Sequence, residues 1–107
     1  MPGDDAETWL LEEGGEVIER MVAESYAALS PRDRLIYCLW VADYGMRNAG
    51  NLVTAADLHA PFLDDGRSAA RELGLPALSA ASSLTSEELE RRYFGLFDGM
   101  IAEIKAE

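Results

Sequence analysis

Residues 35–42 read Leu-Ile-Tyr-Cys-Leu-Trp-Val-Ala, an uncharged apolar run near the middle of a chain of 107 residues. A helix that is apolar on every side has to be contacted on several sides, so this run predicts a central helix. The run is far too short to cross a bilayer. No segment alternates apolar and polar residues as a half-buried strand does. We therefore expect an all-α fold: a compact orthogonal helical bundle of four main helices plus short helical turns, in a single domain over residues 1–107.

Residues suited to capping mark both ends of this central helix. Ser30 can cap the free N–H groups, and Pro31 fits the first helical position. Asp33 lies in the first turn, where the helix dipole favours an acidic side chain. Gly50 suits the left-handed conformation that ends many helices. These signals predict a helix from Pro31 to about Asn48.

On the N-terminal side we expect a helix from about Ala6 to Leu29, which the adjacent Gly14 and Gly15 could interrupt. At about 100° per residue, one apolar face gathers Val17, Ile18, Met21, Val22 and Leu29. Acidic side chains project from the opposite side, interrupted by Arg20. Three of them share that side and two lie at its margin: Glu12, Glu16 and Glu19, then Glu13 and Glu24.

Shorter elements should follow the central helix. Thr54 is placed to start a helix, with Val53 and Leu58 as a hydrophobic staple. Pro61 breaks the chain, because a proline inside a helix removes a hydrogen bond and clashes with the preceding turn. We expect a further helix from about Asp64 to Leu73.

The last helix carries the most regular pattern of the chain. One or two turns over residues 76–83 precede it. Residues 85–88, Thr-Ser-Glu-Glu, form a capping box, and Leu84 with Leu89 forms its staple. The helix should run to near Lys105, with a continuous apolar face made of Leu89, Tyr93, Leu96, Phe97, Met100, Ile101 and Ile104.

The net charge of −11 comes from 20 acidic and 9 basic residues and is unevenly spread. Residues 1–24 hold eight acids against Arg20 alone. Such a chain should repel the phosphates of nucleic acid and of anionic lipid, so we expect neither direct nucleic-acid binding nor membrane binding. Partners with basic surfaces are favoured, although acidity also serves solubility alone. The single Cys38 and the lack of a signal-peptide pattern predict a cytoplasmic protein.

No catalytic or cofactor set is recognisable, so we expect no enzyme activity, no cofactor and no bound metal. His59, Asp64 and Asp65 match no metal-ligand spacing. Cys38 lies inside the most apolar helix, where an inert core residue is favoured over a nucleophile. No phosphate loop, dinucleotide fingerprint or nucleophile elbow is present.

Asp43 is the polar residue of most interest, because it falls on an otherwise apolar face of the central helix. Arg47 follows four residues later, in the acid-first order that favours pairing. A buried acid needs a charged or hydrogen-bonded partner, so we expect a structural Asp43–Arg47 pair. The alternative is a polar site that lines a small pocket with Asn48, beneath the break at Pro61, and binds a small ligand or peptide.

Small residues line one side of the last helix, off its apolar face: Gly95, Gly99 and Ala102. Glycine within a helix costs up to about 1 kcal/mol relative to alanine, which close packing could compensate. A second helix or the mate in a homodimer could fit there. A tolerated bare surface explains the stripe equally well.

Residues 34–52, Arg-Leu-Ile-Tyr-Cys-Leu-Trp-Val-Ala-Asp-Tyr-Gly-Met-Arg-Asn-Ala-Gly-Asn-Leu, place an apolar helix before Asp43, Asn48 and Gly50. Together with residues 69–76, this stretch of sequence resembles the bacterial DNA-mimic proteins, a family of small acidic helical proteins. Its members carry an apolar helix, an acidic residue and an Asn-Gly-Gly-aromatic signature. Here Ala49 replaces the first glycine and Leu52 stands where an aromatic is usual. The resemblance implies a dimeric helical bundle whose acidic surface occupies a DNA-binding protein.

Three hypotheses follow from the sequence. The first is a non-enzymatic module that binds a basic protein, such as a DNA-binding protein, through Glu12, Glu13, Glu16, Glu19 and Glu24. The second is a ligand-binding or peptide-binding pocket around Asp43, Arg47 and Asn48. The third is a structural subunit that dimerises through the last helix.

Overall fold

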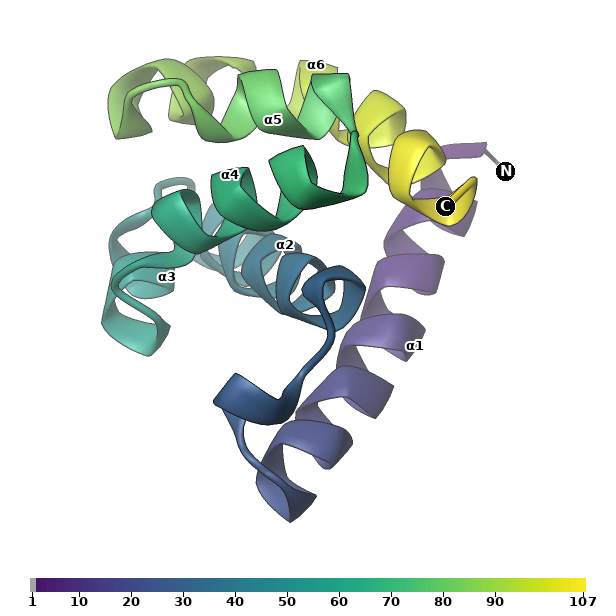
Figure 1. The fold of residues 1–107 in the computed structure, drawn as a ribbon. Helices are drawn as coiled ribbons and strands as arrows, with labels where there is room; N and C mark the ends of the chain where they lie inside the picture. Colours follow the sequence, from purple (N-terminus) through teal and green to yellow (C-terminus); the bar gives the residue numbers. More distant parts are fainter. Residues whose placement is uncertain (1) are drawn as a thin grey trace.

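The computed structural model describes the backbone of residues 2–107 and the side chains of residues 6–107 (Figure 1). Its elements are helices joined by short loops, and the described residues form no strand. In chain order they are α1 (Pro2–Ala23), a single 3₁₀ turn η1 (Tyr26–Ala28), α2 (Pro31–Ala49), α3 (Val53–Leu58), α4 (Phe62–Leu73), α5 (Pro76–Ser82) and α6 (Ser86–Lys105). The predicted all-α bundle with four long helices and short helical pieces is confirmed.

The helix α2 occupies the centre of the bundle, as the apolar run predicted. It is packed against α1, α3, α4 and α6, and Leu35, Ile36 and Val41 are almost fully buried within it. The hydroxyl of Ser30 accepts a hydrogen bond from the backbone N–H of Asp33 at 3.1 Å. Gly50 ends the helix with a φ of 73°, in the left-handed region that favours glycine.

The helix α1 is continuous through both glycines, but it ends at Ala23 and not at Leu29 as predicted. Ser25 caps the separate turn η1, because its hydroxyl accepts a hydrogen bond from the N–H of Ala28. The lower end of α1 extends beyond the body of the bundle (Figure 1). The side chain of Val22 is therefore 80% exposed, and its predicted place on the buried face is wrong.

The start of α3 also differs from its prediction. The helix begins at Val53, and its N-cap Leu52 has no capping side chain. The side chain of Asn51 accepts a hydrogen bond from the N–H of Val53, so the chain turns before Thr54 is reached. A helix of six residues buries only Ala55. Val53 and Leu58 are 63% and 48% exposed, so they form no staple.

The remaining helices begin and end close to the predicted residues. Pro61 separates α3 from α4, which starts two residues earlier than expected, at Phe62. Residues 76–82 form the short helix α5. The hydroxyl of Thr85 caps α6 by accepting a hydrogen bond from the N–H of Glu88. No helix among residues 2–107 is long and apolar enough to span a membrane.

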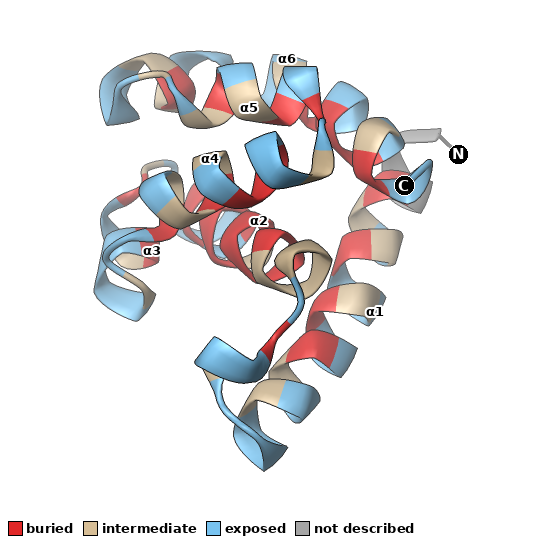
Figure 2. Ribbon diagram, in the orientation of Figure 1, coloured by how far each residue is buried: buried red, intermediate tan, exposed pale blue. Residues whose placement is uncertain are grey.

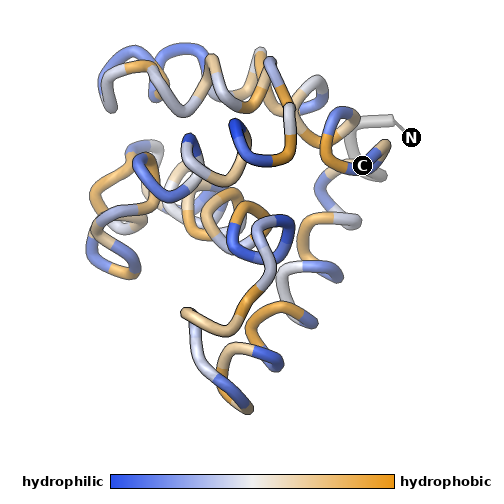
Figure 3. The backbone as a smooth tube through the Cα atoms, in the orientation of Figure 1, coloured by the Kyte–Doolittle hydropathy of each residue, from blue (hydrophilic) through white to orange (hydrophobic). Residues whose placement is uncertain are grey.

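The core lies between α2, α4, α5 and α6, with α1 closing one side (Figure 2). The most deeply buried large side chains come from four different helices. They are Leu10 and Val17 of α1, Leu35, Ile36 and Val41 of α2, Leu78 of α5, and Tyr93, Ile101 and Ile104 of α6. Hydrophobic residues recur on the parts of the chain that face this centre, and hydrophilic residues recur on the outside (Figure 3).

The helix α1 crosses α2, and contacts along one edge and in the middle of the crossing hold it in place. On one edge, Arg20 pairs with Asp33, and the Arg32 guanidinium lies 5.8 Å from the Trp9 ring centre. On the body of the contact, Gly14 lies so close to Trp40 that a β-carbon at position 14 would be 2.4 Å from the indole. The missing side chain of Gly14 therefore sets the distance between the two helices.

Candidate functional site

The outer face of α1 carries the predicted acidic residues. Because the helix is unbroken, Glu12, Glu16 and Glu19 fall within about 60° of arc at about 100° per residue. All three are exposed, and they lie on the side opposite the buried Leu10 and Val17. Side chains three or four residues apart on a helix are neighbours at about 5–6 Å, so the three carboxylates form one row.

The structure leaves two predicted acids outside this row. Glu13 is partly buried, at the edge of α1 that faces the bundle, and Glu24 comes after the helix has ended. Arg20, the basic residue beside the row, is paired with an acid of α2. Arg20 donates from Nε to one carboxylate oxygen of Asp33 at 3.0 Å and from Nη2 to the other at 3.1 Å. This hydrogen-bonded carboxylate raises the pKa of Arg20.

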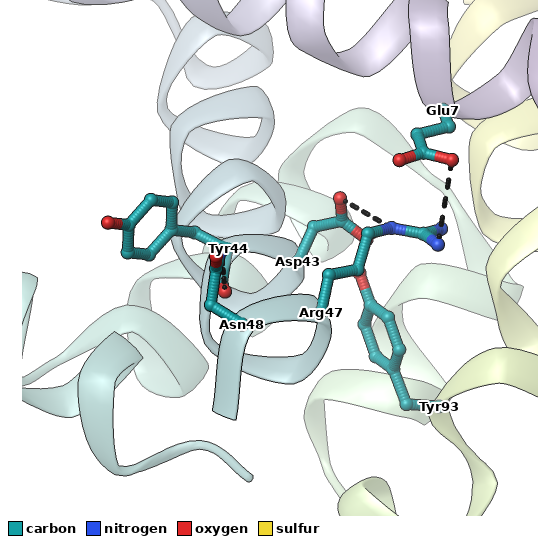
Figure 4. Close-up of polar contacts among 6 residues, drawn as sticks. All are labelled: Glu7, Asp43, Tyr44, Arg47, Asn48 and Tyr93. Carbon is teal, nitrogen blue, oxygen red and sulfur yellow. Dashed lines mark hydrogen bonds and ion pairs between the residues drawn. The ribbon is translucent and has the colours of Figure 1, made fainter. Parts of the chain in front are cut away.

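The buried Asp43 is held by a network that joins three helices (Figure 4). Asp43 is 3% exposed. Arg47 Nε donates to its two carboxylate oxygens at 2.9 and 3.0 Å, and the Tyr93 hydroxyl donates to Oδ1 at 2.7 Å. Arg47 Nη1 also lies 3.6 Å from Glu7 of α1. The predicted Asp43–Arg47 pair is confirmed, and it connects α2 to both α1 and α6.

The two aromatic neighbours of Arg47 complete this network. Its guanidinium carbon lies 5.3 Å from the ring centre of Phe94 and 4.8 Å from that of Phe97, both within cation–π range. Burial and the nearby Asp43 charge raise the pKa of Tyr93 above its ordinary value. Tyr93 therefore stays a neutral hydrogen-bond donor, which a buried carboxylate requires.

A pocket of about 250 Å³ lies beside this network, between α1 and α2, and not beneath Pro61 as expected. Its lining comprises Glu7, Leu11, Trp40, Asp43, Tyr44, Arg47 and Asn48. Asn48 does not share a hydrogen bond with Asp43, because its side-chain amide donates to the backbone oxygen of Tyr44 at 2.8 Å (Figure 4). Both oxygens of Asp43 are already bonded to protein groups, which tie α2 to α6.

The lone histidine contacts an acid and a tyrosine, and the lone cysteine is a buried free thiol. His59 Nε2 lies 2.9 Å from Oδ2 of Asp65. The same Oδ2 accepts a hydrogen bond from the Tyr26 hydroxyl at 2.7 Å. Burial raises the pKa of Cys38 to about 12, which keeps it a neutral thiol. Among the side chains of residues 6–107, no three His, Cys, Asp or Glu groups are placed to hold a metal ion.

The small-residue stripe of α6 faces outward. A β-carbon added at Gly95 or Gly99 would have no neighbour within 4 Å, and Ala102 is exposed. No other described helix of the chain therefore packs on these glycines. The surface remains open, and the alternatives of a second copy and a bare surface both stand.

Two members of the Asp43 network could not be found from the sequence. Glu7 and Tyr93 lie far from Asp43 along the chain, and no local spacing links them to it. The sequence pattern places Tyr93 only on the apolar face of the last helix. Comparison with known proteins adds no further candidate: no family model matches the chain, and neither does a curated protein or a solved structure.

Proposed function

We propose that this chain is a non-enzymatic binding module whose α1 carboxylates engage a basic surface on another protein. The observation that carries the proposal is the row of Glu12, Glu16 and Glu19 on one unbroken, outward-facing helix. Arg20, the basic residue beside the row, is hydrogen-bonded through two nitrogens to Asp33, so the pair adds no net charge to this face. Such a row speeds association with a basic partner and makes its affinity depend on salt.

Within that function, the partner we propose is a DNA-binding protein. Side chains three or four residues apart on a helix leave it from β-carbons about 5–6 Å apart, a repeat similar in scale to that of phosphates along a DNA strand. A protein surface built to bind phosphates would also attract this face. The resemblance of residues 34–52 to the DNA-mimic family supports the same partner class.

The test is a pulldown at low salt with three forms of the tagged chain, eluted with rising salt. The variant Glu12→Gln, Glu16→Gln, Glu19→Gln removes the row. The variant Glu87→Gln, Asp98→Asn, Glu107→Gln removes three exposed carboxylates elsewhere and is its matched control. We expect the partner to bind about tenfold more weakly to the first variant, and unchanged to the second, since exposed charges contribute modestly and additively.

Two results would contradict the proposal. Equal weakening by both variants would mean that only net charge matters, and unchanged binding by the first would remove α1 from the interface. Once a partner is isolated, double-stranded DNA should displace it from the chain. A partner that holds the chain and DNA at the same time would leave the acidic interface standing but reject DNA mimicry.

A further inference from the structure

A second row, apolar and exposed at three of its four positions, runs along α1 beside the acidic row. It consists of Leu11, Gly15, Ile18 and Val22, spaced by four, three and four residues. Leu11 and Val22 are 55% and 80% exposed, and nothing lies within 4 Å of the β-carbon position of Gly15. Ile18 is partly buried and anchors the row to the core. This spacing is that of the two core positions of a coiled-coil heptad.

The same helix uses an identical spacing to pack inward. Leu10, Gly14, Val17 and Met21 follow the same interval of four, three and four residues and face the bundle. The outward row is this buried row shifted by one residue, which rotates it by about 100°. The buried row is therefore packed against the protein's own core. The equivalent row of Leu11, Gly15, Ile18 and Val22, which we call the outward seam, faces solvent.

The acidic row flanks the outward seam on one side. Glu12 follows Leu11 directly, and Glu19 follows Ile18 directly. In a coiled coil these flanking positions form ion pairs with the neighbouring helix and decide which partner is accepted. Two glutamates at such positions repel an acidic helix and attract lysine or arginine. Charge complementarity thus selects a basic occupant over a second copy of α1.

The pocket between α1 and α2 extends the seam at its N-terminal end. Leu11 lines this pocket together with Trp40 and Tyr44, whose rings stack 5.5 Å apart. Tyr44 is 44% exposed. Buried aromatic side chains contribute much of the binding energy in protein interfaces, and a pocket of this kind can receive one anchoring side chain.

We propose that the outward seam of α1 binds an amphipathic helix of a partner, apolar along one stripe and rich in lysine or arginine beside it. The apolar stripe would pack on Leu11, Gly15 and Val22, while the basic residues would meet Glu12 and Glu19. One side chain near the end of the helix would enter the pocket beside Trp40. The inference rests on the proposed function, and it specifies the structure of the basic surface that is recognised.

The first test uses a synthetic peptide of about three heptads, with leucine at the two core positions and lysine at the flanking positions. The control peptide has the same composition in an order that places leucine and lysine on all sides of a helix. We expect the patterned peptide to bind at least about tenfold more tightly by fluorescence anisotropy. Equal affinity for both peptides, or no binding of the patterned one, would overturn the inference.

The second test changes the protein. Leu11→Ser with Val22→Ser should weaken binding of the patterned peptide by about tenfold, since two apolar contacts are lost. Val53→Ser with Leu58→Ser is the matched control, because it removes two exposed apolar side chains on α3. All four side chains are about half exposed or more, so each variant should fold, which circular dichroism would verify. Equal effects of the two pairs would reject the seam.

The outcomes separate this inference from the function on which it rests. If the glutamine variant of α1 loses its partner while the serine variant keeps it, the acidic interface stands and the helical seam is wrong. If the serine variant loses its partner while the glutamine variant keeps it, the acidic interface is wrong. If neither variant loses its partner, both proposals fail.

Discussion

Asp43 shows how one buried residue can tie a small bundle together. Its carboxylate needs several donors because burial removes it from water. The donors come from Arg47, one turn along the same helix, and from Tyr93 on α6. Arg47 in turn reaches Glu7 on α1. Removing any single donor leaves the others in place but under-compensates a charge that is almost fully buried.

Replacing Tyr93 with phenylalanine tests this account. The variant keeps the ring in the core but leaves Asp43 Oδ1 without its tyrosine donor. A hydrogen bond to a charged group contributes about 1.5–3 kcal/mol, so the free energy of unfolding in urea should fall by about that amount. Tyr44→Phe is the control, since the Tyr44 side chain is 44% exposed and lies outside the core. Equal losses in the two variants would contradict a role for the buried hydroxyl.

At the scale of the elements, two adjacent glycines in α1 have opposite surroundings. A β-carbon at Gly14 would lie 2.4 Å from the Trp40 indole, whereas Gly15 faces open space. Sequence alone leaves the continuity of the helix open at this pair, because glycine is unfavourable inside a helix. The structure assigns the first glycine to close packing and the second to the outer seam.

Replacing each of these two glycines with alanine should therefore change the free energy of unfolding in opposite directions. Gly14→Ala should lower the free energy of unfolding by about 1–3 kcal/mol, because α1 and α2 must separate to accept the methyl group. Gly15→Ala should raise it by about 0.5–1 kcal/mol, because alanine restricts the unfolded chain and favours the helix. Urea denaturation of both variants measures the difference. Destabilisation of similar size at both positions would contradict the close contact with Trp40.

The elements that sequence predicted well are those with their own end signals. Ser30 and Gly50 bound α2, and Thr85 caps α6, so both were placed to within a residue or two. The end of α1 was misplaced because Val22 and Leu29 share a face on an ideal wheel, although the chain leaves the helix at Ala23. Local patterns carry no information about where a helix leaves the body of the bundle.

In the candidate sites, too, only contacts between residues close in sequence could be predicted. The Asp43–Arg47 pair could be predicted because its members are one helical turn apart. Tyr93 lies 50 residues from Asp43, and only the tertiary fold brings them together. The pocket was expected near Pro61, but it formed against α1, because the sequence does not say which helix covers a given face of α2.

At the scale of the whole molecule, the buried thiol of Cys38 and the buried phenol of Tyr93 make the free energy of unfolding depend on pH in the alkaline range. Burial raises the pKa of Cys38 to about 12, and that of Tyr93 also lies well above its ordinary value of 10.0. In the unfolded chain these groups release their protons near pH 9.0 and 10.0. Above those values the folded state holds more protons than the unfolded one, so the free energy of unfolding falls as pH rises.

Urea midpoints measured from pH 7 to about 11 should therefore be level at first and then decline above about pH 9. The variant Tyr93→Phe starts from a lower stability, but its decline above about pH 10 should be shallower, because one titrating group has been removed. A decline of the same slope in both proteins would mean that Tyr93 does not titrate with folding.

The crossing of α1 over α2 has a spectroscopic consequence. The chain has two tryptophans. Trp9 lies on α1 beneath Arg32, and Trp40 lies on α2 against Gly14. Both indoles thus lie at the same helix contact, and the tryptophan fluorescence of the unlabelled protein reports how α1 packs on α2. A helix that lifts away would expose both rings to water and shift their emission to longer wavelength, whereas a partner that docks on the outer face would cover the rim of Trp40 and shift it the other way.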